Sequence, residues 1–233
     1  MDINDPECPL LVELKNVSKP EYYHTIHTAY LCSRIALQLK LDDAVVKACA
    51  YYHKIWLLKG ENNWENAEQI LTGNQIPLRV RELLKQYLSP AEQLVDREVI
   101  VLLFADTVIS SIDYLFSKDK NVQLDYQKLI QTIYKRKMES GILDHSEISL
   151  GDLQKMKQIL VDERLYYDFL RWKWKWYHIW FWYRGTGFAY WKPVFVLDVE
   201  GAETDAGDLG VHRGVAIQNL RFQIIQIDRK SVV

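Results

Sequence analysis

A histidine followed by a lysine stands in an otherwise apolar stretch, Ala50-Tyr51-Tyr52-His53-Lys54-Ile55-Trp56-Leu57-Leu58. An imidazole nitrogen is a good ligand for divalent metals, and a carboxylate directly after it can bridge two such ions. We interpret the pair as a metal-binding His-Asp step in which Lys54 stands in place of the aspartate. Because an ammonium group has no acceptor lone pair and repels a cation, the sequence predicts the frame of a metallohydrolase with part of its chemistry lost.

Further segments belong to the same pattern. They are Asp5-Pro6-Glu7-Cys8-Pro9-Leu10-Leu11 with Tyr22-Tyr23-His24-Thr25-Ile26, then Ala105-Asp106-Thr107-Val108, and finally the runs 135–144 and 150–160. In this order and spacing, the chain resembles the HD-domain phosphohydrolases over roughly residues 5–170. The likeness is closest to the cytoplasmic HD domain of the membrane-anchored, seven-helix (PgpH-type) cyclic-di-AMP phosphodiesterases. The motif is degenerate, since it has His-Lys where the family has His-Asp.

The resemblance implies a set of metal ligands, of which this chain retains a part. His24, His53 and Asp106 match metal positions, but the family's additional histidines have no counterpart, because none occurs between His53 and His145. Three ligands can hold one weakly bound divalent metal (Mn, Fe or Zn), whereas they cannot build a two-metal clamp. The other interpretation is that no metal binds, and that His24 and His53 make ordinary hydrogen bonds.

Two functions follow from the resemblance. The missing ligands favour a non-catalytic binding or regulatory module, related to the cyclic-dinucleotide phosphodiesterases, that holds a nucleotide in the old cleft. The alternative is a residual phosphohydrolase or phosphodiesterase in which a single metal generates a hydroxide nucleophile and neutralises phosphate charge. Lys54 is compatible with both functions. It stands in place of a metal ligand, yet its ammonium group can donate a hydrogen bond to a substrate phosphate. Whether the protein is an enzyme therefore stays open at this point, and no catalytic residue is assigned.

Composition narrows the class of protein. The chain of 233 residues is 48% hydrophobic and 26% charged, which is typical of a soluble globular protein. A net charge of −2 gives no electrostatic case for binding duplex nucleic acid. The cysteines at 8, 32 and 49 have neither metal-site spacing nor an even number, which favours reduced thiols in the cytoplasm. The most apolar run, 99–116, carries two aspartates and predicts a buried helix rather than a transmembrane span.

Helix-start signals predict a mainly α domain over residues 1–172, an HD-like helical bundle. Ser18-Lys19-Pro20-Glu21 is a capping box, and Asp42, Asn63, Pro77 and Ser149 also stand before apolar-periodic runs. The predicted helices cover 18–39, 42–53, 63–71, 77–87, 97–116, 123–140 and 149–172.

The chain changes character near residue 172. Six of its eight tryptophans lie between Trp172 and Trp191, and the first three alternate with lysines, a period of two that is typical of strands. We predict a small β-rich module over 173–233, whose tryptophans pack on its own sheet, on the helical domain or on a protein partner. A base-stacking surface and a membrane-interface surface are the alternatives.

Overall fold

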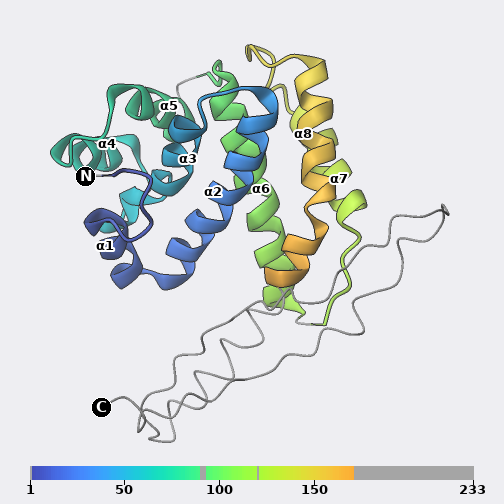
Figure 1. Ribbon diagram of the computed structural model, residues 1–233, viewed down its shortest axis with the longest axis horizontal. Coiled ribbons are helices and arrows are strands. Elements are labelled where there is room, and N and C mark those ends of the chain that lie inside the picture. Colours follow the sequence, from blue (N-terminus) through green and yellow to red (C-terminus); the bar gives the residue numbers. More distant parts are fainter. Residues whose placement is uncertain (1, 90–92, 120, 171–233) are drawn as a thin grey trace, which may run out of the picture. The chain divides into compact units, whose positions relative to one another are not determined.

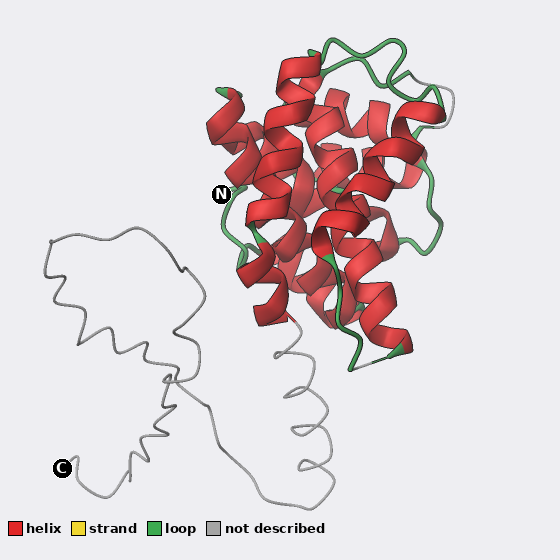
Figure 2. Ribbon diagram, turned by 90° about the vertical axis from the view of Figure 1, so that its right-hand side faces the viewer, coloured by secondary structure: helices red, strands yellow, loops and turns green. Residues whose placement is uncertain are grey.

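The computed structural model describes residues 2–89, 93–119 and 121–170, and this part of the chain is built from helices (Figure 1). In chain order they are α1 (Pro9–Val17), α2 (Lys19–Leu39), α3 (Asp43–Tyr52), the short 3-10 helix η1 (Ile55–Leu58), α4 (Trp64–Gly73), α5 (Leu78–Leu88), α6 (Arg97–Lys118), α7 (Tyr126–Glu139) and α8 (Leu150–Asp162). Residues 164–170 are also helical. Figure 2 shows no strand within the described residues, so the mainly α prediction is confirmed there. The predicted β-rich module at 173–233 lies outside the described residues, as does the boundary near 172.

Side-chain caps account for three of the predicted helix starts. Each cap accepts a hydrogen bond from the backbone N–H three residues later: Asp42 from Val45, Asn63 from Asn66, and Ser149 from Asp152. Such a bond satisfies a donor that the first turn of a helix cannot pair internally. Ser18 precedes α2 as predicted, but its side chain makes no capping hydrogen bond. At that start, Pro20 provides a backbone angle already suited to a helix.

The core lies where α2 packs against α3 and α6. In Figure 1 these are the two blue helices and the green helix at the centre. On α6, Ile100, Phe104, Val108 and Ile112 are fully buried and follow one another at four-residue intervals. Side chains at this spacing share one face of a helix. Burial of this apolar face therefore holds α6 in the core. It also decides where along α2 and α3 the polar residues of α6 lie.

Helix α6 is also long and apolar enough, by length and composition alone, to cross a membrane. For this run the sequence predicted a buried helix rather than a transmembrane span. In the structure, 61% of its most apolar 18-residue window is buried inside the protein. The helix also carries Asp106 and Asp113. A core helix passes the same test of length and composition.

The predicted helix over 149–172 is interrupted at Glu163. Its backbone angles there are φ −77° and ψ 15°, and a second helical stretch begins at residue 164. The Glu163 carboxylate accepts hydrogen bonds from Arg34 at 2.8 Å and from Tyr30 at 2.9 Å, both on α2. These bonds hold Glu163 against α2. Because both donors lie on α2, they could not be predicted from residues 149–172 alone.

Candidate metal centre

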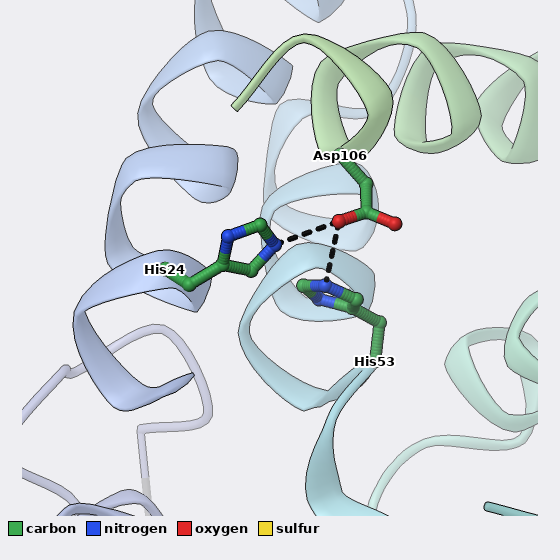
Figure 3. Close-up of side chains that lie close together, drawn as sticks. All are labelled: His24, His53 and Asp106. Atoms are coloured by element: carbon green, nitrogen blue, oxygen red, sulfur yellow. Dashed lines mark hydrogen bonds and ion pairs between the residues drawn. The ribbon is translucent and has the colours of Figure 1, made fainter. Parts of the chain in front are cut away.

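Three helices bring His24, His53 and Asp106 together (Figure 3). His24 belongs to α2, His53 ends α3, and Asp106 lies in the middle of α6. One ligand atom from each side chain lies within 4.8 Å of the other two. The three residues that the family resemblance singled out therefore converge, although their binding of a metal stays a prediction.

Asp106 is the centre of this cluster. Its Oδ1 lies 2.7 Å from Nε2 of His24 and 3.5 Å from Nε2 of His53, as the dashed lines in Figure 3 mark. The Ser110 hydroxyl donates to the same oxygen at 3.2 Å, and the Tyr87 hydroxyl donates to Oδ2. Burial disfavours the charged carboxylate, but the hydrogen bond with His24 and the positive charge of that ring outweigh it and hold the pKa of Asp106 well below its usual range. Asp106 is therefore an anion that faces both histidines.

His53 has the protonation state of a metal ligand. Its Nδ1 donates to the carbonyl oxygen of Ala50 at 2.7 Å, which leaves Nε2 as the unprotonated nitrogen of the neutral ring. The side chain is 1% exposed, and burial lowers its pKa. Within the part of the chain that the structure describes, the buried Nε2 has no hydrogen-bond partner, although Oδ1 of Asp106 is near. A buried lone pair beside a carboxylate oxygen is costly by itself, and a cation between the two atoms would satisfy both.

His24 lies between two carboxylates of α6. Its Nε2 faces Asp106, and its Nδ1 lies 3.3 Å from Oδ2 of Asp113. Burial opposes protonation of this imidazole, but the hydrogen bonds to Asp106 and Asp113 outweigh it and raise the pKa of His24 to about 9. If a cation displaced the proton at Nε2, Nδ1 would still donate to Asp113. This is the carboxylate–histidine–metal arrangement that orients metal-binding histidines in proteins.

The cluster has dimensions suited to one divalent cation. Bonds of about 2.0–2.2 Å from a metal to nitrogen or oxygen place neighbouring ligand atoms about 3.0–3.5 Å apart. The two nitrogen-to-oxygen distances, 2.7 and 3.5 Å, lie close to this separation. Two neutral imidazoles and a carboxylate are also a donor set that Zn, Fe and Mn accept. The three ligand atoms lie within 4.8 Å of one another, so His24, His53 and Asp106 would fit one cation once the two histidines move closer together.

A cleft of about 550 Å³ opens beside the cluster. Its wall includes His53, Asp106, Lys54, Trp56 and His145. The Nζ of Lys54 lies 4.0 Å from Oε2 of Glu21, and the lysine side chain is 24% exposed. A positive charge therefore lies on the cleft wall directly after His53, and Glu21 neutralises part of it.

Comparison with known proteins places the fold. No protein-family model matches the sequence, and no curated protein sequence matches it. The HD domain of the L. monocytogenes phosphodiesterase PgpH matches in structure with a TM-score of 0.58 at 12% identity, over 67% of this chain and 97% of that chain. The same HD domain in complex with cyclic-di-AMP matches with a TM-score of 0.57 at 13% identity, over 68% and 97%. The chain has an HD-domain-like fold.

Sequence reasoning missed two residues of this HD-like domain that bear on the site. Asp113 was noted only as a charge in an apolar run, although it follows Asp106 by seven residues and so lies two turns along the same face of α6. That spacing is a signal that could have found it. His145 was treated only as the end of a stretch without histidines, and the structure places it on the cleft wall. Nothing local in the sequence connects residue 145 with residue 53.

Proposed function

We propose that this HD-like domain is a non-catalytic module that binds a cyclic dinucleotide in the cleft, with at most one divalent cation at His24, His53 and Asp106. The observation that carries the proposal is the position of Lys54. An ammonium group lies on the cleft wall at the point where a His-Asp step would supply a carboxylate. The complex of the similar PgpH HD domain with cyclic-di-AMP supports the class of ligand.

The charges of the site suit a bound phosphate better than its hydrolysis. Lys54 presents a point charge that can pair with a phosphate oxygen, as lysines do in many phosphate sites. It supplies no ligand for a second metal, and two-metal hydrolysis needs two ions that stabilise both the attacking and the leaving oxygen. Trp56, a partly buried wall residue, offers an aromatic face for a base.

One observation favours a second candidate, a phosphodiesterase with a single metal. The Nε2 of His53 has no hydrogen-bond partner among the described residues and faces the carboxylate of Asp106, so the cluster retains a place for a cation. A divalent cation held by His24, His53 and Asp106 would neutralise phosphate charge and lower the pKa of a water. In this candidate, Lys54 binds the substrate phosphate and holds it next to the cluster.

Binding and turnover of cyclic-di-AMP separate the two candidates. We expect calorimetry with added Mn²⁺ to show binding, which Lys54→Ala weakens about tenfold through the loss of a charge-assisted hydrogen bond. Lys155→Ala is the matched control, because Lys155 is an exposed lysine of α8 outside the cleft wall. We expect no turnover with Mn²⁺ or Fe²⁺. Robust turnover that His53→Ala abolishes would establish the second candidate, and absence of binding by the wild type would contradict both.

A further inference from the structure

Beyond Asp106, helix α6 carries further polar side chains at four-residue intervals. They are Ser110, Tyr114 and Lys118. Side chains four residues apart lie one above another on the surface of a helix. With a rise of about 1.5 Å per residue, Tyr114 lies about 12 Å along the helix axis from Asp106. A row of a hydroxyl, an aromatic ring and an ammonium group therefore begins at the candidate metal centre.

Two residues of this row, Ser110 and Tyr114, line a second cavity, the α6 groove, of about 440 Å³. Its wall includes Asp106, Ser110 and Tyr114 from α6 and Leu129 from α7. The cleft described above also reaches Asp106, but its other contribution from α6 is Leu103. Because Leu103 lies one turn before Asp106 and Ser110 one turn after it, the two cavities extend from Asp106 in opposite directions along the helix axis.

The side chains of the α6 groove can contact a ligand. The Ser110 hydroxyl donates to Oδ1 of Asp106 at 3.2 Å and retains its own lone pairs as acceptors. The Tyr114 ring is 61% exposed, and the Nζ of Lys118 lies 5.4 Å from its centroid. By contrast, Thr107 and Ser111 donate to backbone oxygens of α6 itself, at 2.6 and 2.7 Å. The exposed ring is therefore the feature of the groove best suited to stack against a base.

We infer that the α6 groove is a second subsite and that Tyr114 determines specificity in it. This inference rests on the proposed function, because it requires a phosphate beside Asp106, at the divalent cation that His24, His53 and Asp106 would hold. A phosphate monoester carries one organic group, whereas a phosphodiester carries two. With a phosphodiester of a dinucleotide at Asp106, one nucleoside extends into the cleft and the other into the groove, where its base stacks on Tyr114. The ammonium group of Lys118 attracts the second phosphate towards the same end of the helix.

The test compares the affinities of wild type and Tyr114→Ala for cyclic-di-AMP and for AMP, by calorimetry with Mn²⁺. We expect Tyr114→Ala to weaken binding of the dinucleotide about tenfold, as the loss of one base–aromatic stack predicts, and to leave binding of AMP unchanged. Tyr114→Phe keeps the ring and should bind like the wild type. Phe169→Ala is the matched control, because Phe169 is a similarly exposed aromatic residue, 60% exposed, that lines neither cavity.

The outcomes separate this inference from the proposed function. If Lys54→Ala weakens dinucleotide binding and Tyr114→Ala does not, the groove is no subsite while the proposed function stands. The groove would also be no subsite if the wild type bound AMP and cyclic-di-AMP with equal affinity. The same holds if Tyr114→Ala weakened binding of both nucleotides equally. If the wild type binds neither nucleotide, the inference is wrong together with the proposed function.

Discussion

Asp106 and Glu163 are both carboxylates that lie against α2, one from α6 and the other from the residue after α8. The side chain of Asp106 is 15% exposed and that of Glu163 is 11% exposed. Asp106 meets the imidazoles of His24 and His53. The two sites therefore present similar anions to the same helix, and they differ in the partners that face them.

The partners decide what each carboxylate can do. Glu163 accepts hydrogen bonds from the guanidinium of Arg34 and the hydroxyl of Tyr30. A guanidinium keeps its charge at every accessible pH and offers no lone pair, so Arg34 cannot bind a metal beside the carboxylate. An imidazole can lose its proton and present that lone pair to a cation. The comparison teaches that a buried carboxylate becomes a candidate metal site through its neighbours.

The largest expected effect is on binding of Mn²⁺. Asp106→Ala removes the only anionic ligand of the three predicted ones, so we expect affinity to fall by more than about 100-fold, beyond the usual effect of an outer-shell change. Glu163→Gln is the control, and it should bind Mn²⁺ like the wild type. Calorimetric titration measures both. A similar loss of Mn²⁺ affinity in the two variants would contradict the claim that Asp106 is a metal ligand and Glu163 is not.

Proton competition at His24 gives the next effect. Since the pKa of His24 is raised from its ordinary 6.5 to about 9, the ring is protonated at neutral pH and a cation must displace that proton. We expect affinity for Mn²⁺ to rise about tenfold per pH unit up to about pH 9. The stability that protonated His24 gives to the metal-free fold has the opposite trend, since it is complete below about pH 6.5 and is lost as pH rises through about 9.

Titrations at pH 6.5, 7.5 and 8.5 follow this dependence. An affinity that does not change over this range would show that His24 is neutral in the metal-free protein. That result would contradict the expectation that Asp106 and Asp113 keep the ring protonated. Unfolding measured at the same pH values provides the second half of the test.

Replacing Lys54 examines the rim of the candidate metal centre. Lys54→Asp exchanges a repelling charge for an oxygen ligand, so we expect affinity for Mn²⁺ to rise about tenfold. Lys54→Met removes the charge without adding a ligand and should give a smaller increase. Equal affinities of the two variants would indicate that Asp at position 54 does not reach the cation, and unchanged affinity in both would indicate that the lysine does not influence the cluster.

The smallest expected effect concerns the hydrogen bonds that Glu163 accepts from Arg34 and Tyr30. Glu163→Gln weakens two hydrogen bonds, but Arg34 is 54% exposed and regains water, so we expect the free energy of unfolding to fall by about 1–2 kcal/mol. Urea denaturation measures it. A change within error would mean that other contacts hold the segment 164–170 on α2, such as the hydrogen bond between Nδ1 of His27 and the Tyr166 hydroxyl.

Local signals in the sequence were sufficient for much of the fold. The caps Asp42, Asn63 and Ser149 act within three residues, and one apolar face of α6 repeats every four, from Ile100 to Ile112. Such features depend on neighbours within one or two turns, so most of the helices could be predicted from the sequence, whereas α1 and η1 were not. The convergence of His24, His53 and Asp106 was predicted from a family resemblance, since no local rule joins three helices.

Only the tertiary structure decided what surrounds those three residues. Asp113 meets His24 across 89 residues of sequence, and Glu163 meets Arg34 across 129. The carbonyl of Ala50 is close in sequence to His53, yet the bond that sets the imidazole tautomer depends on how the end of α3 is buried. Helix propensity and capping are short-range properties, whereas proton positions, clefts and ligand geometry arise where distant helices pack. The sequence therefore determined the elements, and packing decided their chemistry.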